Sequence, residues 1–201
     1  MTMDGPPAAT EQRQQRPHRD YYTALYQAAL TISSSLELSQ VLQSVVKSTT
    51  EAMQVKACAL RLLDPASGQL YLSAVYGLSE DYLAKGVVSI TQSAIDSEAL
   101  RGQPVYIADA RTDPRFQYQE AARAEGLVSI LCVPLQVHGV AIGVMRVYTD
   151  RPTAFLDEDV KFLSILARLA ALAIENARLY ENVKNSYEGL MAALLGTPGS
   201  L

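Results

Sequence analysis

The sequence has few of the side chains on which metal binding and covalent catalysis depend. Its 201 residues include two cysteines, two histidines and no tryptophan. Cys58 and Cys132 lie far apart and match no zinc-binding spacing, and neither a GxSxG motif nor a Gly-rich phosphate loop is present. His18 falls in a polar leader and His138 precedes a glycine at an expected turn, so neither is expected to act as a base. The sequence therefore predicts a protein that is not an enzyme and has no metal site, and it identifies no cofactor.

An excess of positive charge and long apolar runs are also missing. The 17 basic residues are outnumbered by 21 acidic residues, and the resulting net charge of −4 disfavours nucleic acid as a partner. The most apolar stretch, 162–174, contains Arg168 and is too short to span a bilayer. The N-terminus lacks the apolar segment of a signal peptide. We therefore expect a cytoplasmic protein that does not bind a membrane.

The hydrophobic pattern predicts one α+β domain with short tails. Residues 1–19 are expected to be a disordered leader, residues 20–185 the domain and residues 196–201 a frayed tail. Because short turns join the expected strands in pairs, the sheet should be antiparallel, with the terminal helices on one face. Apolar periods of 3.6 and 2 residues predict helices at 20–33, 38–53 and 157–195, and strand pairs at 57–63 with 70–76 and at 129–135 with 140–148.

Several stretches resemble the GAF family of small-molecule sensor domains. In chain order they are Leu60-Arg61-Leu62-Leu63-Asp64, Asp113-Pro114-Arg115-Phe116, Ser129 to Leu135, Phe155 with Asp159, and Ala173 to Ala177. Their order and spacing along residues 20–185 carry the resemblance, since each piece alone is short. The resemblance implies a central six-stranded antiparallel sheet, with terminal helices packed on one face and a ligand pocket covered by loops and helices on the other. It implies no particular ligand, because this fold hosts many functions.

The residues that distinguish particular branches of this family are incomplete here. The reductases of free methionine sulfoxide need a resolving pair of cysteines near the pocket, whereas Cys58 and Cys132 each lie within an apolar strand. The bilin-binding branch needs a Cys-His pair that the sequence lacks. The cyclic-nucleotide branch is matched at Phe155 and Asp159, but its Asn-Lys pair and its Glu are replaced. The resemblance therefore leaves the ligand unidentified.

Strand alternation places two arginines on the expected pocket side of the sheet. In the last strand, Arg146 and Tyr148 lie on the opposite face from Gly143, which is small enough to suit close helix packing. Arg61 lies on the opposite face from its two leucine neighbours in the first strand. A charge in a central strand costs free energy unless it is paired or solvated. Each arginine is therefore expected to form a salt bridge, to be exposed, or to meet the anionic group of a ligand.

The segment 109–116 is the densest polar cluster of the domain. Its Asp109 and Asp113 are the expected salt-bridge partners of the two strand arginines. Asp113-Pro114 favours a turn, and Phe116 is expected to plug the core. Alternatively, the segment lines a small cavity together with nearby tyrosines. The candidate ligand-binding residues are Arg61, Tyr106, Asp109, Arg111, Asp113, Arg115, Phe116, Tyr118, Ser129, Arg146 and Tyr148.

The last helix carries two apolar faces. We assign one of them to the sheet: Phe162, Leu166, Ala170, Ala173, Ala177 and Tyr180. The other has the 4,3 spacing of a coiled-coil seam, as does the first helix, so helices of two subunits are expected to form a bundle. The alternative is that this face packs on the chain's own first two helices. The predicted dimer seam comprises Tyr22, Leu25, Ala29, Ile32, Ile165, Leu169, Leu172, Asn176, Leu179 and Val183.

Together these features predict a non-enzymatic sensory domain that binds a small molecule and forms a homodimer through its terminal helices. Ligand state would pass to a histidine kinase, a cyclase or a transcriptional output, as in bacterial two-component signalling. The chain is either a free-standing sensor or a fragment of a longer one. Two alternatives stay open: a protein-interaction or dimerisation module with a vestigial pocket, and a small redox enzyme similar to the methionine sulfoxide reductases.

Overall fold

The computed structural model describes residues 20–34 and 37–195, so the predicted leader and tail lie outside the described residues. The helices overlap the ranges predicted from the sequence, and three short helices lie between the strands. The helices are α1 (Tyr21–Ser34), α2 (Leu38–Met53), α3 (Glu80–Leu83), α4 (Ala94–Ala99), α5 (Gln119–Glu125) and α6 (Asp157–Leu195). The strands are β1 (Ala57–Asp64), β2 (Gln69–Tyr76), β3 (Val88–Ser89), β4 (Val105–Ile107), β5 (Ile130–Val137) and β6 (Val140–Tyr148).

The strands form one six-stranded sheet in the order β3-β2-β1-β6-β5-β4. Every neighbouring pair is antiparallel. The two hairpins β1–β2 and β5–β6 join through β1 and β6, so the ends of the domain's sequence meet at the centre of the sheet. This arrangement confirms the predicted six-stranded antiparallel sheet.

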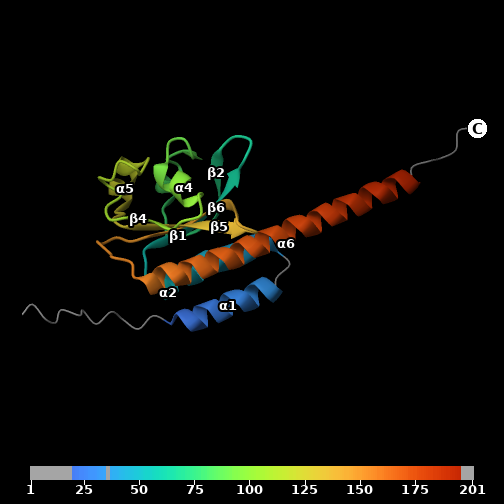
Figure 1. Ribbon diagram of the computed structural model, residues 1–201, viewed down its shortest axis with the longest axis horizontal. Coiled ribbons are helices and arrows are strands. Elements are labelled where there is room, and N and C mark those ends of the chain that lie inside the picture. The colour runs from blue at the N-terminus through green and yellow to red at the C-terminus, as the bar shows by residue number, and fades with distance from the viewer. Residues whose placement is uncertain (1–19, 35–36, 196–201) are drawn as a thin grey trace, which may run out of the picture.

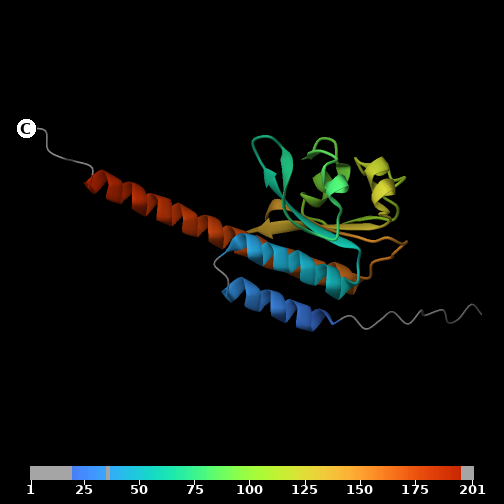
Figure 2. The same cartoon turned by 180° about the vertical axis from the view of Figure 1, so that it is seen from behind.

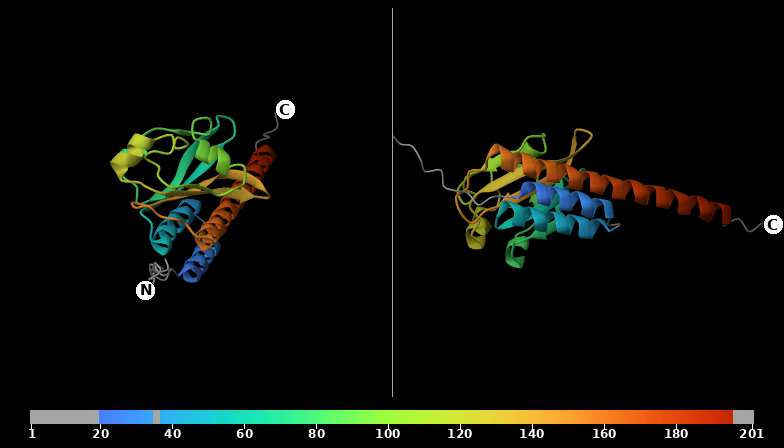
Figure 3. Two further views of the ribbon diagram at one scale, coloured as in Figure 1. Left: turned by 60° about the vertical axis from the view of Figure 1, so that its left-hand side comes forward. Right: turned by 90° about the horizontal axis from the view of Figure 1, so that it is seen from below.

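The sheet separates two layers of different character. α2 and α6 lie side by side against one face, and α1 packs on the outside of both (Figures 1 and 2). The short helices and their loops cover the opposite face, as the end-on view in Figure 3 shows. Terminal helices therefore occupy one face, as predicted, and leave the other to the loop layer.

The helical layer is closed by apolar stripes. α2 turns its valines and Leu42 toward the sheet. α6 buries Leu163 and Ile174 together with four residues predicted for that face: Phe162, Leu166, Ala170 and Ala173. Ala177 of the predicted face is half-buried. The ring of Tyr21 on α1 stacks on Phe162, with 3.9 Å between ring centroids. The assignment of Tyr180 to the sheet is wrong: Tyr180 is 71% exposed, because it lies in the part of α6 that follows Ile174, the last fully buried residue of this helix.

The pairing of β1 is irregular next to Arg61. Leu60 pairs with Ala74 of β2 but Arg61 pairs with Leu72, so one residue of β2 is skipped in a β-bulge. On the other side of β1, a Cβ on Gly143 would lie 2.2 Å from the backbone oxygen of Arg61. Gly143 is therefore required by the close approach of the β1 backbone, which the sequence alone attributed to helix packing. Bulges re-aim side chains and are frequent near functional sites.

α6 continues well beyond the body of the domain. Its last fully buried residue is Ile174, and all side chains from Arg178 to Ala192 are exposed. The part that follows Ile174 is about 30 Å long, and Figure 1 shows it projecting away from the sheet. None of the described helices is both long enough and apolar enough to cross a bilayer.

Candidate functional site

Arg146 forms a buried ion pair on the sheet face opposite the long helices. Its Nε donates to Asp96 Oδ1 at 2.9 Å, and its second terminal nitrogen donates to Asp96 Oδ2 and, at 3.3 Å, to Ser93 Oγ. The two charged side chains are 3% and 0% exposed. Burial opposes the charge of Arg146, but the Asp96 carboxylate raises the pKa of the guanidinium well above its ordinary value. The protein itself therefore satisfies Arg146.

The expected salt bridges from the strand arginines to Asp109 and Asp113 are absent from the described residues. Each aspartate instead pairs with the arginine two residues later, Arg111 at 2.7 Å and Arg115 at 2.7 Å. The hydrogen bond from Arg111 holds the pKa of Asp109 at about 2. Because these short-range pairs form within the loop, its carboxylates are already neutralised, and the segment is built as an Asx-type turn.

Arg61 is buried without a comparable partner. Its side chain is 6% exposed, and its Nε has no hydrogen-bond partner. One terminal nitrogen reaches the backbone oxygen of Leu70, at a distance of 3.5 Å. Burial is the main cause that lowers the pKa of Arg61, and the nearby charge of Arg146 acts in the same direction. The side chain thus carries a positive charge that the surrounding protein balances poorly.

Two further residues of the loop layer face this charge. Tyr82 on α3 is 3% exposed and its hydroxyl has no hydrogen-bond partner. Lys85 lies over the ring of Tyr82, with its Nζ 3.5 Å from the ring centroid. Burial, aided by the charges of Arg61 and Arg146, lowers the pKa of Lys85 to about 7. Tyr82 packs in the same apolar cluster as Leu70, whose backbone oxygen meets Arg61, and the charges of Arg61 and Arg146 both act on Lys85. Arg61, Arg146, Lys85 and Tyr82 are here called the basic cluster.

Tyr82 and Lys85 belong to residues 79–90, a segment of the loop layer that is here called the cover. At its start, Ser79 donates to the Glu125 carboxylate through both its backbone nitrogen and its hydroxyl. Near its end, the Tyr118 hydroxyl donates to the backbone oxygen of Val87 at 2.7 Å. Both anchors come from the region of α5, so the cover is attached by polar contacts at its two ends.

The remaining predicted ligand-binding residues divide into two groups. Tyr148 and Phe116 are buried in the apolar cluster of the loop layer, and the Phe116 ring lies 5.8 Å from the Arg146 guanidinium carbon. Tyr106 and Ser129 hold loops together instead. The Tyr106 hydroxyl donates to the backbone of Thr153, and the Ser129 hydroxyl donates to the backbone of Ala108. The structure thus brings Arg61, Arg146, Tyr148 and Phe116 into one region. Tyr118 lies at its edge, with its ring centroid 5.6 Å from the Lys85 ammonium, and the others lie outside it.

Sequence reasoning missed four residues of this region: Ser93, Asp96, Tyr82 and Lys85. Ser93 and Asp96 stand three residues apart at the start of a helix, a spacing that is typical of helix capping. In the structure, Ser93 makes no side-chain capping hydrogen bond and accepts from Arg146 instead. The sequence signal that could have identified Asp96 is its place on a short helix between the apolar residues Ile95 and Ala99, both of which are buried.

The two cysteines do not form a redox pair. Cys58 belongs to the core beneath the long helices, whereas Cys132 belongs to the core on the loop side of the sheet. Both are free thiols, and burial raises the pKa of each well above its ordinary value. A buried, protonated thiol is a poor nucleophile, so the redox alternative gains no support from the geometry.

The predicted dimer seam is largely uncovered in the single chain. Exposed fractions are 89% for Tyr22, 45% for Ile165, 48% for Leu172, 56% for Leu179 and 69% for Val183. The predicted seam residues Ala29 and Asn176 are exposed, and Leu25, Ile32 and Leu169 are half-buried. Packing on the chain's own helices therefore covers this face only in part.

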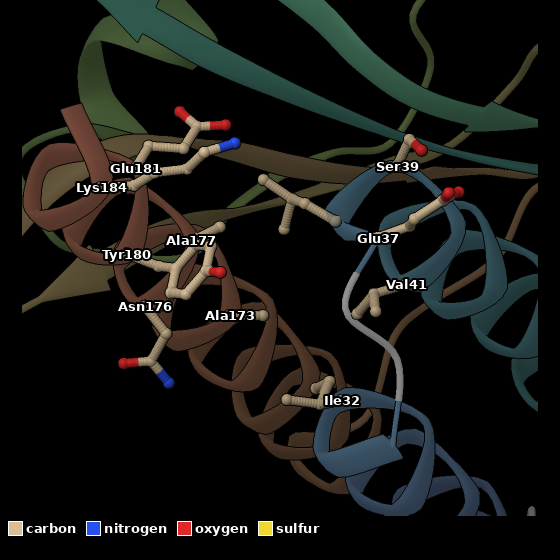
Figure 4. Close-up of a pocket in the computed structure, with 11 residues that line it drawn as sticks. Ile32, Glu37, Ser39, Val41, Ala173, Asn176, Ala177, Tyr180, Glu181 and Lys184 are labelled. Atoms are coloured by element: carbon tan, nitrogen blue, oxygen red, sulfur yellow. The ribbon is translucent and has the colours of Figure 1, made fainter. Parts of the chain in front are cut away.

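A groove of about 540 Å³ lies between the end of α1, the start of α2 and α6. Figure 4 shows Ile32 and Val41 on one side of it, with Asn176 and Tyr180 on the other. Two of these residues, Ile32 and Asn176, belong to the predicted seam. The groove is on the helical side of the molecule and is separated by the sheet from the basic cluster.

The sequence and the fold of this chain are similar to those of known GAF domains. The family model for the GAF domain matches residues 37–174. Nitrogen fixation protein VnfA of Azotobacter vinelandii is 30% identical over 174 residues, which are 83% of this chain and 33% of that protein. An uncharacterized sensor-like histidine kinase of Chloroflexus aurantiacus is 26% identical over 178 residues, which are 88% of this chain and 29% of that protein. The chain therefore spans about a third of the length of these curated relatives.

Solved structures agree with the family match. The GAF domain of a phosphoenolpyruvate-protein phosphotransferase from Coxiella burnetii has a TM-score of 0.72 and 25% identity, covering 81% of this chain and 96% of that one. Other relatives are Nif-specific regulatory proteins, so GAF domains related to this one occur in regulatory and sensory proteins. From the match over residues 37–174 and the shared fold, this chain belongs to the GAF domain family.

Proposed function

We propose that this chain is a non-enzymatic sensory domain that binds a small molecule at the basic cluster and forms a homodimer through α1 and α6. The observation that carries this proposal is the arrangement of β6. Arg146 on one face of β6 belongs to the ion pair of the loop layer, while its neighbours Met145 and Val147 pack in the core under α6. A ligand that shifts β6 would therefore move the surface on which α6 rests.

The exposed apolar residues on the helical side of the molecule support the proposed dimer. The exposed apolar residues of α6 continue at heptad spacing from Ile165 to Val183, a pattern typical of coiled coils. Asn176 lies within this stripe and would fix the register of two paired helices. The projecting part of α6 would then carry the ligand state to an output such as a histidine kinase, a cyclase or a transcriptional domain. The similarity to a sensor-like histidine kinase supports this order of events. A cytoplasmic location stays a prediction.

The proposal is tested by native mass spectrometry of the purified chain, with light scattering at several protein concentrations. We expect a dimer that carries an additional small mass. Replacing Leu172 and Leu179 together by lysine should give a monomer, because each subunit would then place two positive charges in the apolar seam. Val140→Lys is the matched control, since Val140 is 65% exposed and lies at the start of β6, away from the seam.

The assembly state and the retained mass together distinguish the sensory domain from the interaction module. An empty dimer that the lysine pair dissociates would favour the interaction module with a vestigial pocket. A wild-type monomer at all concentrations would refute dimerisation through α1 and α6. A dimer that the lysine pair leaves intact would show that the interface lies elsewhere on the chain.

A further inference from the structure

We propose that the small molecule carries an oxyanion group, a carboxylate or a phosphate, and that Arg61 and Tyr82 bind this group while the Arg146–Asp96 pair stays intact. This inference rests on the proposed sensory function and specifies the ligand class of the same site. It also narrows the expectation that either strand arginine could bind the ligand, because the structure gives only Arg146 a carboxylate partner.

Two buried donors of the basic cluster, Arg61 Nε and Tyr82 Oη, have no acceptor within the part of the chain that the structure describes. Among the described residues, three buried side-chain polar atoms lack a hydrogen-bond partner, and two of them, Arg61 Nε and Tyr82 Oη, belong to the basic cluster. Each can donate a hydrogen bond. Buried polar groups are nearly always paired, so an unpaired group calls for a missing water or ligand. Two such donors in one electrostatic site point to one shared acceptor.

The second observation concerns charge. The basic cluster contains three cationic side chains, Arg61, Arg146 and Lys85, and the buried carboxylate of Asp96 pairs with Arg146 alone among them. The Glu125 carboxylate also acts on Lys85, but it accepts both donors of Ser79. The site therefore holds more positive than negative charge inside a largely buried layer. An anion would reduce the repulsion among the three cations as well as occupy the two free donors.

The third observation concerns the identity of the binding arginine. Arg146 uses Nε and one terminal nitrogen on Asp96, so an incoming anion would have to displace a buried carboxylate from it. The Nε of Arg61 is free, and the β-bulge beside Arg61 fixes the direction of its strand segment. A guanidinium binds carboxylate and phosphate through parallel N–H groups, which favours an oxyanion over a neutral carbonyl.

One residue of the cover at residues 79–90 adds a third cation to the site. Lys85 is half-buried in this segment, and its Nζ donates to the backbone oxygen of Tyr82 at 3.0 Å. Its position at the edge of the basic cluster would allow the ammonium to face a bound anion. We therefore assign Arg61 and Tyr82 as the residues that contact the oxyanion and Lys85 as an additional positive charge.

The test uses acetate, succinate and inorganic phosphate as probes, at constant ionic strength, on wild-type protein refolded from urea so that no ligand is retained. Binding is followed by the Nε–Hε nuclear magnetic resonance signal of Arg61 and by calorimetry. We expect saturable binding of at least one probe at or below about 10 mM. Arg61→Gln should weaken that binding by about tenfold or more, and Tyr82→Phe by a smaller factor. Preference for phosphate or for a carboxylate probe identifies which oxyanion the site favours.

Arg151→Gln is the matched control, because Arg151 is exposed and lies outside the basic cluster. If Arg61→Gln does not fold, Arg61→Met replaces it, since methionine suits a buried position. The inference is overturned if no probe binds saturably, if both Arg61 variants bind as the wild type does, or if Arg151→Gln weakens binding equally. A neutral molecule retained in the native mass spectrum, without any response to the anions, would sustain the proposed function while refuting the oxyanion.

Discussion

The two buried arginines are expected to change the stability of the protein in opposite directions when each is replaced by methionine. Arg61 and Arg146 stand on neighbouring central strands and are 6% and 3% exposed, so both substitutions remove a charge from a similar depth. They differ in their partners: Arg146 is bound by Asp96, whereas the Nε of Arg61 is unpaired. The comparison therefore isolates the effect of the partner.

Arg146→Met should lower the free energy of unfolding by about 3–5 kcal/mol, because it leaves the Asp96 carboxylate buried without its counter-ion. Arg61→Met should raise the free energy of unfolding by about 1–3 kcal/mol, because it removes an unsatisfied donor and a poorly balanced charge. For a chain of this size, each kcal/mol corresponds to about 2–4 °C in the midpoint of thermal unfolding. The two variants should thus unfold at clearly different temperatures, one on each side of the wild type.

The assay is urea unfolding followed by circular dichroism, with thermal unfolding as a second measure. All proteins are refolded from urea and compared at one protein concentration, because a retained ligand or a dimer would add its own stabilisation. The double variant Asp96→Leu with Arg146→Met should recover most of the loss, since it removes both charges. If Arg61→Met destabilised the protein as strongly as Arg146→Met, Arg61 would have a partner in the folded state, and the argument for a free donor would be refuted.

Three further changes test other contacts. Burial lowers the pKa of Lys85 to about 7 in the folded protein, so the unfolded chain binds more protons than the folded chain above that pH. The free energy of unfolding of the wild type, relative to that of Lys85→Met, should therefore rise from pH 7 toward pH 10. A difference that does not change with pH would contradict the lowered pKa of Lys85. The titratable and charged groups that act on this amine are Arg61, Tyr82, Tyr118, Glu125 and Arg146. Gly143→Ala should lower the free energy of unfolding in urea by about 1–3 kcal/mol, because its Cβ would lie 2.2 Å from the Arg61 backbone oxygen. Gly189→Ala on α6 is the control: its Cβ would meet nothing within 4 Å, so this change should raise the stability of the protein slightly. Tyr21→Phe should cost about 1–2 kcal/mol by thermal unfolding, since it removes a 2.5 Å hydrogen bond to the buried Asp159, and an unchanged midpoint would show that this contact contributes little.

Local patterns were sufficient to predict the architecture because each pattern has one physical cause. The alternation of Leu60, Arg61 and Leu62 places Arg61 opposite its neighbours in any strand, and the structure confirms that face. The apolar stripe of α2 faces the sheet for the same reason. His138 is at an exposed turn, as predicted from the glycine that follows it.

Contacts between segments that are distant in the chain could not be predicted from the sequence. Asp109 and Asp113 were the expected partners of the strand arginines, but their own loop supplies nearer arginines at the second residue along. The partner of Arg146 is Asp96, fifty positions away in the chain, on a short helix whose acidic residue has the spacing of a helix cap. Tyr180 shows the same limit on α6, where the apolar period continues beyond the buried part of the helix.

Local sequence patterns were enough to predict the two strand pairs, the face of the sheet on which their residues lie, and the long helix with its apolar stripe, whereas the count of six strands came from the resemblance to the GAF family. The strand pairs, their faces and the helix follow from periodicity, which acts over a few neighbouring residues and is independent of the rest of the chain. The tertiary structure alone decided which arginine has a carboxylate and which is left with a free donor. That choice depends on how the loops between β3 and β5 fold over the sheet, because an ion pair forms only where two charges from different segments meet in a buried space.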